Sequence, residues 1–279
     1  MAHVKWAMTI ERMKPVILLI GCGRMGSALL KGWLARGIKS IAVVEPKPSA
    51  QLKALAKKKS ISLFAAPSQV RGKPSVCVVA IKPQVLKGEA ATLAEYAVRG
   101  ALMISIAAGT SVAALSKAWG KKARIIRAMP NTPGAIGAGI TGIFAARGVT
   151  ASDRKRAVAL LSALGETEWV SKETLIDSVT AVSGSGPAYL FLMAEALTEA
   201  GVAEGLPRAQ AEKFARATVA GAGALLSADM TSASKLREAV TSPGGTTAAA
   251  LGVLMAADGL PALMKRAVHA AKKRAEELS

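Results

Sequence analysis

The sequence predicts an α/β protein in which a doubly wound sheet is followed by an all-helical domain. Short apolar runs alternate with helical patterns over the first half of the 279-residue chain, which is typical of parallel strands buried on both faces. The first run is followed by Gly21, Gly23 and Gly26, a spacing that predicts a tight turn into a helix. From about Glu173 onward the strand pattern stops and helical segments follow one another. Together these features indicate a Rossmann-type sheet and a separate helical domain.

The composition favours a globular protein without a nucleic-acid or membrane partner. Hydrophobic residues make up 51% of the chain and aromatic residues 4%, so helices are expected to pack closely through small side chains. The net charge of +19 is spread over several segments rather than gathered on one recognition element beside aromatic side chains. No run approaches the ~18 apolar residues of a spanning helix. Cys22 and Cys77 fall in apolar surroundings and suggest no disulfide framework, so a cytoplasmic protein is expected.

Five apolar runs are the expected strands of the sheet: residues 16–20, 41–44, 75–81, 101–107 and 124–128. Two of them are followed by small, polar or proline-bearing turns, at residues 82–84 and 108–110. Ligands of open α/β sheets bind at the carboxyl ends of strands. These turns are therefore expected to border a cofactor.

The glycine-rich turn after the first strand predicts a dinucleotide site. Gly21 permits the turn, Gly23 lets a pyrophosphate approach the backbone, and Gly26 lets the helix pack on the strand. Glu45 ends the second strand, near the spacing of about 20 residues at which an acid meets a ribose 2′-hydroxyl. A carboxylate there disfavours the 2′-phosphate of NADPH, whereas Lys47 and Ser49 could bind it. The choice between NADH and NADPH stays open.

The second half of the chain predicts a helical domain that pairs with a second copy. Pro187 and Pro207 suit the first turns of helices, and Gly201 suits a C-terminal cap. So many small apolar positions in about 105 residues require a partner chain to cover them, and a homodimer is the simplest partner. The expected helices cover residues 173–182, 187–200, 207–227, 232–240, 246–257 and 261–277.

The segment TSPGGTTAAALGVL at 241–254 predicts a helix that begins with free backbone N–H groups. Two adjacent glycines precede a run of good helix formers. A helix start attracts anions because its first N–H groups lack partners and the helix dipole is positive there. We expect the N–H groups of Gly245, Thr246 and Thr247 to bind an anion, with Ser242 closing the site. An ordinary loop and helix start is the alternative.

Five sequence motifs, in their order along the chain, resemble those of pyrroline-5-carboxylate reductase. The last two are specific to that family, whereas the first is shared by many dinucleotide-binding proteins. The motifs are IGCGRMG at 20–26, VAIKPQ at 79–84, RAMPNTP at 127–133, VSGSGPAYLF at 182–191 and TSPGGTTAAAL at 241–251. The resemblance covers nearly the whole chain except residues 1–14.

The resemblance implies an oxidoreductase that reduces 1-pyrroline-5-carboxylate to L-proline, the last step of proline synthesis, with NADPH or NADH. It implies an N-terminal extension at 1–14, a dinucleotide-binding Rossmann domain at 15–172 and a helical substrate and dimerisation domain at 173–279. A homodimer is expected, and larger rings of dimers occur in the family.

The resemblance also gives roles to single residues. Thr247 matches the family's substrate-contacting threonine, so its hydroxyl is expected to bond the ring nitrogen as the catalytic contact. Glu173 matches an acidic position near the family's substrate site, but it could equally be a charge at a helix start. The residues expected to bind substrate are Glu173, Ser242, Gly244, Gly245, Thr246 and Thr247. The residues expected to line the dinucleotide are Ile20, Gly21, Cys22, Gly23, Arg24, Met25, Gly26, Glu45, Lys47, Ala80, Ile81, Lys82, Pro83, Ile106 and Ala108.

Imine reduction fits a chain whose motifs contain no histidine. Carbonyl reduction usually requires an acid such as His or Lys beside the oxygen, and the two histidines, His3 and His269, lie outside the motifs. A cyclic imine can bind already protonated. The enzyme then has to provide mainly a binding site for the substrate carboxylate, a hydrogen-bond partner for the ring nitrogen and a nearby hydride donor. Orientation of the substrate therefore supplies much of the rate acceleration.

Three other functions remain open. A reductase for another imine, or a β-hydroxyacid dehydrogenase, would share this architecture, although the lysine expected for the latter is absent from the glycine-rich helix start. A non-catalytic dinucleotide sensor would bind cofactor without turnover. A nucleic-acid binder, suggested by the net charge alone, would show salt-dependent affinity for DNA or RNA.

Overall fold

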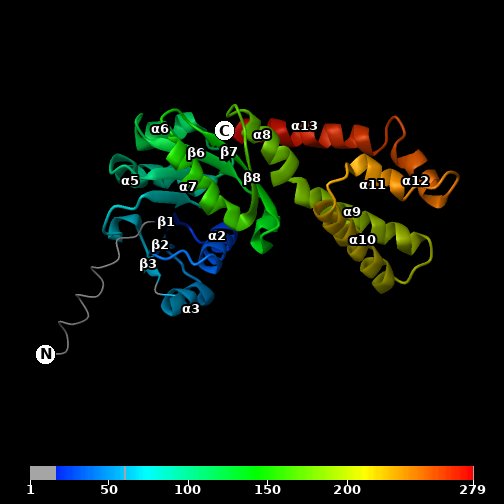
Figure 1. Cartoon of the computed structure of the whole chain (residues 1–279), viewed down its shortest axis with the longest axis horizontal. Helices are drawn as coiled ribbons and strands as arrows, with labels where there is room; N and C mark the ends of the chain where they lie inside the picture. The colour runs from blue at the N-terminus through cyan, green and yellow to red at the C-terminus, as the bar shows by residue number, and fades with distance from the viewer. Residues whose placement is uncertain (1–16, 60, 279) are drawn as a thin grey trace. The chain divides into compact units, whose positions relative to one another are not determined.

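The computed structural model describes residues 17–59 and 61–278, which form two compact units (Figure 1). The sheet unit contains the described residues up to Gly184 together with the end of the chain from Lys272 onward. The helical unit is Ser185–Ala271. The division falls later in the chain than the predicted domain boundary after residue 172. The predicted extension at 1–14 lies outside the described residues.

The sheet unit contains a sheet in the order β3-β2-β1-β4-β5-β6-β7-β8. Neighbouring strands from β3 to β6 are parallel, β7 is antiparallel to β6, and β8 is parallel to β7. The strands are β1 (Ile17–Ile20), β2 (Ile41–Val44), β3 (Ser62–Phe64), β4 (Val76–Val79), β5 (Leu102–Ser105), β6 (Arg124–Met129), β7 (Gly139–Ala145) and β8 (Gly165–Trp169). The order of β1 to β6 is that of the Rossmann fold, which confirms the predicted fold class.

Helices pack on the sheet because its strands are apolar on both faces. Ile17 and Leu19 of β1 enter one hydrophobic cluster, whereas Leu18 and Ile20 enter the other. The helical segments of this unit are α2 (Arg24–Ala35), α3 (Ala50–Lys59), η1 (Pro67–Gln69), α4 (Pro83–Glu89), η2 (Ala90–Leu93), α5 (Ala94–Val98), α6 (Val112–Trp119), η3 (Thr132–Ile136), α7 (Ala151–Leu161), η4 (Ser162–Leu164), α8 (Leu175–Val179) and η5 (Thr180–Gly184).

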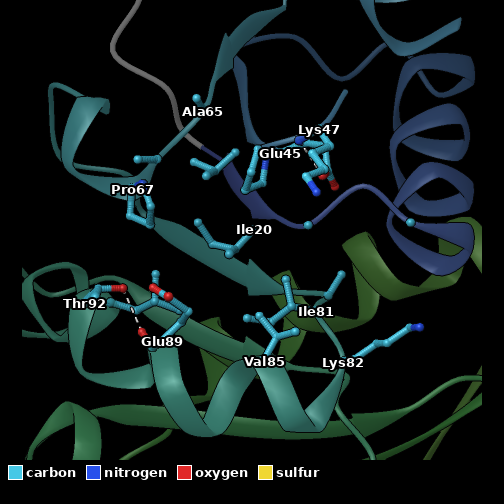
Figure 2. A pocket seen from close by; sticks show the side chains of 17 residues that line it. Ile20, Glu45, Lys47, Ala65, Pro67, Ile81, Lys82, Val85, Glu89 and Thr92 are labelled. Carbon is cyan, nitrogen blue, oxygen red and sulfur yellow. Dashed lines mark hydrogen bonds between the residues drawn. The ribbon is translucent and has the colours of Figure 1, made fainter. Parts of the chain in front are cut away.

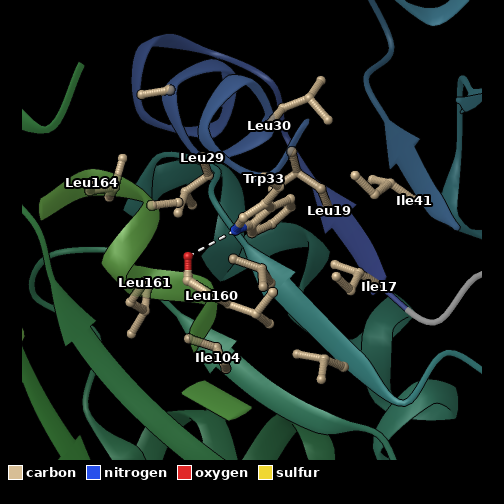
Figure 3. Close-up of a cluster of buried hydrophobic side chains, with 14 of the residues drawn as sticks. Ile17, Leu19, Leu29, Leu30, Trp33, Ile41, Ile104, Leu160, Leu161 and Leu164 are labelled. Atoms are coloured by element: carbon tan, nitrogen blue, oxygen red, sulfur yellow. Dashed lines mark hydrogen bonds between the residues drawn. The ribbon is translucent and has the colours of Figure 1, made fainter. Parts of the chain in front are cut away.

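Trp33 joins α2 to the end of α7 in the first of these clusters (Figure 3). Its ring is fully buried, and its Nε1–H donates a hydrogen bond of 2.8 Å to the Leu160 carbonyl oxygen. A buried indole is stable only when its N–H finds such a partner. This contact holds in place the helix that begins at the glycine-rich turn.

Three strands of the sheet were not predicted. β3 is short and only partly buried, so it lacks a continuous apolar run. β7 reads GITGIFA and β8 reads GETEW, and their glycines and charged residues interrupt the pattern. The sheet therefore continues past the predicted parallel strands, with β7 antiparallel to β6 and β8 parallel to β7.

The helical unit confirms the predicted series of helices. It contains α9 (Gly186–Ala203), α10 (Arg208–Ala228), α11 (Ala233–Ala239), α12 (Thr246–Leu254) and most of α13 (Leu260–Leu278). The predicted cap at Gly201 is wrong, because α9 continues past it and Gly205 takes the positive φ of +94°. A Cβ at Gly201 would lie 3.3 Å from the Cβ of Ala211, so this glycine lets α9 and α10 pack closely.

The helical unit leaves much of its apolar surface exposed. Of its residues, only Thr198, Ala211 and Ala215 are buried. Large apolar side chains that are exposed include Leu190, Phe191, Leu192, Phe214, Leu225 and Leu226. Within the described part of the chain, no helix is long and apolar enough to cross a membrane.

Candidate active site

The turn after β1 has the geometry that a dinucleotide phosphate requires. Gly21 has a φ of +87°, and a Cβ there would lie 2.8 Å from the Ala80 carbonyl oxygen, so no other residue fits without strain. A Cβ at Gly26 would collide with the Gly21 carbonyl oxygen, so this glycine lets α2 pack on the turn. At Gly23, by contrast, the space that a Cβ would occupy is open to 4 Å. The backbone is therefore accessible where a pyrophosphate would approach it.

Glu45 is held against this turn by two backbone amides. Its Oε2 accepts a hydrogen bond of 2.9 Å from the Cys22 N–H, and its Oε1 accepts one of 3.1 Å from the Lys47 N–H. The first bond joins the end of β2 to the glycine-rich turn. The half-buried carboxylate is therefore fixed at the end of β2, beside the glycine-rich turn.

A cavity of about 510 Å³ lies beside Glu45, where β1, β2, β3 and β4 end (Figure 2). Its volume is within the usual range of small-molecule sites. Of the residues expected to line the dinucleotide, it contains Ile20, Gly21, Gly23, Glu45, Lys47, Ala80, Ile81 and Lys82. The expected residues that do not line this cavity are Cys22, Arg24, Met25, Gly26, Pro83, Ile106 and Ala108.

Part of the cavity wall was missed from the sequence. Ala65, Ala66 and Pro67 follow the short edge strand β3, which carried no clear signal, and Glu89 and Thr92 come from α4 and η2. Figure 2 shows Glu89 and Thr92 on the opposite side of the cavity from Glu45. The cavity thus has carboxylates on two sides.

Glu173 is bound to neighbours within the sheet unit. Its Oε1 accepts hydrogen bonds from the Val112 N–H and from Nη1 of Arg127, each 2.7 Å long. Arg127 on β6 is only 4% exposed, and its Nη2 lies 4.0 Å from Oδ1 of Asp177. The expected substrate residue therefore belongs to a largely buried charge cluster at the start of α6.

The remaining expected substrate residues lie in the helical unit, at the start of α12. Gly245 is the N-cap, and Gly244 before it has a φ of +68°. The Gly245 N–H donates to the Ser242 carbonyl oxygen at 3.0 Å, and a Cβ on Gly245 would collide with the Ser242 hydroxyl. Thr246 and Thr247 are the first helical residues, so their N–H groups have no intrahelical acceptor. Thr246 and Thr247 therefore carry N–H groups of the predicted kind, with Thr247 half-buried and Thr246 exposed. The N–H of Gly245 was predicted to be free as well, but Ser242 occupies it.

The described residues offer neither a reactive thiol nor a metal cluster beside these sites. Burial raises the pKa of Cys22, and burial also raises the pKa of Cys77, so both thiols stay neutral near pH 7. No group of three or more His, Cys, Asp or Glu side chains in this part of the chain could hold a metal ion. His269 is exposed on α13.

Asn131 shapes the turn after β6. Its Oδ1 accepts a hydrogen bond of 3.0 Å from the Ile140 N–H. The Asn131 amide oxygen therefore serves the backbone between β6 and β7.

Comparison with known proteins gives one consistent family. Residues 173–278 match the family model "Pyrroline-5-carboxylate reductase dimerisation", and residues 16–109 match "NADP oxidoreductase coenzyme F420-dependent". The pyrroline-5-carboxylate reductase of Pseudomonas aeruginosa is 37% identical over 95% of this chain and 97% of its own. That of Synechocystis sp. is 41% identical over 93% of this chain and 97% of its own.

Solved structures agree with these sequences. A pyrroline-5-carboxylate reductase from Coxiella burnetii superposes with a TM-score of 0.88 at 37% identity, covering 95% of this chain and 99% of that one. The Plasmodium falciparum pyrroline carboxylate reductase, solved with NADP bound, gives 0.79 at 26% identity and covers 96% and 98%.

Proposed function

This chain belongs to the pyrroline-5-carboxylate reductase family, and we propose how its residues carry out the reaction. It is an oxidoreductase that reduces 1-pyrroline-5-carboxylate to L-proline with a nicotinamide cofactor. When bound, the reduced nicotinamide supplies a hydride to the imine carbon. The C=N double bond becomes a single bond, and the nitrogen keeps the proton with which the iminium entered.

The sheet unit fits the dinucleotide. Gly23 leaves its backbone open, and the cavity at the strand ends continues from it past Glu45. The observation that carries our proposal on cofactor choice is the pair of amide bonds that fixes the Glu45 carboxylate. A fixed carboxylate accepts hydrogen bonds from ribose hydroxyls and repels a 2′-phosphate. We propose NADH as the preferred cofactor, although the Plasmodium falciparum relative was solved with NADP.

The start of α12 is proposed to hold the substrate carboxylate. The N–H groups of Thr246 and Thr247 and the positive end of the helix dipole stabilise an anion there, and the space beside Gly244 is open to 4 Å. The Thr247 hydroxyl is proposed to bond the ring nitrogen, so it orients the iminium rather than titrating. This role predicts a lower kcat/KM for Thr247→Ala, by about tenfold to a hundredfold.

A matched control separates this role from a general loss of stability. Thr231→Ala removes an exposed hydroxyl from the same unit and keeps the N–H that bonds Asp229. It should retain wild-type kcat/KM. Wild-type kcat/KM in Thr247→Ala would contradict the proposed contact.

The helical unit is proposed to form a homodimer. The family model that matches it is a dimerisation model, and its exposed Leu, Phe and Val side chains form too much apolar surface for a monomer. A larger ring of dimers is compatible with this proposal.

Steady-state turnover tests the function directly. Oxidation of NADH and, separately, of NADPH with 1-pyrroline-5-carboxylate is followed at the nicotinamide absorbance, and proline is identified as the product. We expect turnover with both and a higher kcat/KM with NADH. A folded protein that binds the dinucleotide but does not reduce this imine would contradict the function. If that protein reduced another imine instead, it would be a reductase for a different substrate.

A further inference from the structure

We infer that Glu173 is a positioning residue for the cofactor loop, defined as residues 106–111 between β5 and α6, and not a substrate ligand. The inference rests on the proposed function, because it takes a dinucleotide that begins in the cavity beside Glu45 to continue along the carboxyl ends of the strands to residues 106–111, which do not line that cavity themselves. It assigns Glu173 a role for which its place in the sequence gives no sign.

The carboxylate of Glu173 determines where the cofactor loop ends. The loop leads into α6 at Val112, whose N–H is bonded at 2.7 Å to Oε1 of Glu173. The N-cap Ser111 satisfies a different donor, the Ala114 N–H, at 3.3 Å. Glu173 thus supplies an acceptor that the helix start lacks, from a segment 61 residues further along the chain.

Arg127 fixes the position of that acceptor. In the parallel register of β5 and β6, Arg127 lies opposite Ser105, the last residue of β5. Its buried guanidinium donates to the same Oε1 of Glu173, and Asp177 lies on its other side. A buried guanidinium requires such partners. If this Glu173 oxygen turned to a substrate, the buried Arg127 guanidinium would lose its hydrogen-bonded carboxylate and keep only that of Asp177, 4.0 Å away.

The loop is held at two further points. The Ala107 N–H donates to the Ser105 hydroxyl at 3.3 Å, near the start of the loop. In its middle, Gly109 has a φ of +61°, and a Cβ there would lie 2.8 Å from the Cβ of Leu278 at the end of α13. Glu173 holds the end of the loop. Loss of this contact lets the loop populate other conformations, and the apparent Kd for the cofactor rises in inverse proportion to the competent fraction.

The test measures cofactor binding and substrate KM separately. Kd values for NADH and NADPH are obtained from nicotinamide fluorescence without substrate, and KM for 1-pyrroline-5-carboxylate is measured at saturating cofactor. Glu173→Ala should raise the Kd about tenfold, as loss of about 1.4 kcal/mol would, and leave the substrate KM within about twofold. Glu173→Gln keeps the acceptor and should stay within about threefold of wild type in Kd.

Two further variants keep the test independent of folding. Val112→Pro removes the N–H donor alone, at the first helical position, where proline is tolerated, and it retains the Glu173–Arg127 pair. It should raise the cofactor Kd in the same direction as Glu173→Ala. Glu168→Ala removes an exposed carboxylate from β8 and should change neither constant.

Some outcomes would overturn the inference. A raised substrate KM with an unchanged cofactor Kd in Glu173→Ala would make Glu173 a substrate ligand, and an unchanged Kd in a folded Val112→Pro would remove the role of the bond. Failure of the proposed function is seen separately, as absence of imine turnover in the wild-type protein, while the cofactor Kd values still report on Glu173.

Discussion

Replacing Glu45 with Gln should change the cofactor preference of this enzyme. The substitution keeps the size of the side chain and one acceptor oxygen, so one of the two bonds to the Cys22 and Lys47 N–H groups can remain. It removes the negative charge at the end of β2. The Lys47 side chain, which lines the same cavity, then becomes the dominant charge near the ribose.

The size of the effect follows from the position of the carboxylate. Two like unit charges about 4 Å apart repel by about 1 kcal/mol in bulk water and by about 4 kcal/mol at an effective dielectric constant of ~20. Glu45 is half-buried at the edge of the cavity, so about 2 kcal/mol is appropriate, which is about thirtyfold in kcat/KM for NADPH. NADH loses a hydrogen bond to a charged acceptor, which lowers its kcat/KM about tenfold.

The assay compares kcat/KM for NADH and NADPH at saturating 1-pyrroline-5-carboxylate, in wild type and in Glu45→Gln. Glu89→Gln is the matched control, because Glu89 lines the same cavity from α4 and its replacement changes the charge equally. Glu45→Gln should move the ratio toward NADPH more than Glu89→Gln does, because Glu89 lies on the opposite side of the cavity from Glu45 (Figure 2) and repulsion between like charges falls with distance. A wild-type preference for NADPH, or equal changes with both cofactors in Glu45→Gln, would refute the reasoning.

Three other variants test the fold and the assembly. Thr141 is fully buried on β7, and its hydroxyl has no hydrogen-bond partner among the described residues, so Thr141→Val should raise the free energy of unfolding in urea by about 1 kcal/mol; a decrease would show that the hydroxyl is satisfied. Burial raises the pKa of Asp153, but hydrogen bonds from Thr150 and the charge of Arg124 outweigh it and hold this pKa below its usual value. The stabilisation is therefore present above the unfolded pKa and lost as the pH falls through the folded pKa, so Asp153→Asn should lower the unfolding free energy by about 1–2 kcal/mol at pH 7 and by less at pH 3; a pH-independent difference would contradict this. Phe191→Glu places a charge on the exposed apolar surface of α9 and should give a monomer in sedimentation, whereas an unchanged mass would place the interface elsewhere.

The strands that could be predicted from the sequence are those whose own residues form a continuous apolar run. β2 occupies the predicted residues 41–44 because all four of its residues are apolar and buried. β8, by contrast, alternates glutamates with partly buried residues. Its place in the sheet depends on pairing with β7 and on contacts such as that of Arg154 with the Trp169 ring, 4.6 Å from its centroid. Such contacts arise only in the folded chain.

The candidate site, like the fold, has a part that the sequence predicted and a part that it did not. The glycine-rich turn and Glu45 were predictable because the turn requires glycine at fixed spacing and an acid follows at the end of the next strand. The wall formed by Ala65, Ala66 and Pro67 was not, because small residues after a weak edge strand have no chemical signature. Three-dimensional proximity to Glu45 is what makes them part of the cavity.

Glu173 shows why local sequence alone misleads about a charged residue. Its position before α8 allowed two interpretations, a substrate ligand or a charge at the start of its own helix. The structure shows a third arrangement, in which Glu173 binds the first N–H of α6 and Arg127 of β6, 61 and 46 residues away. Because the buried Arg127 keeps its partner only if the carboxylate stays in place, the charge that looks available for catalysis is committed to the cofactor loop. A carboxylate near an active site therefore has to be judged by the donors that already occupy it.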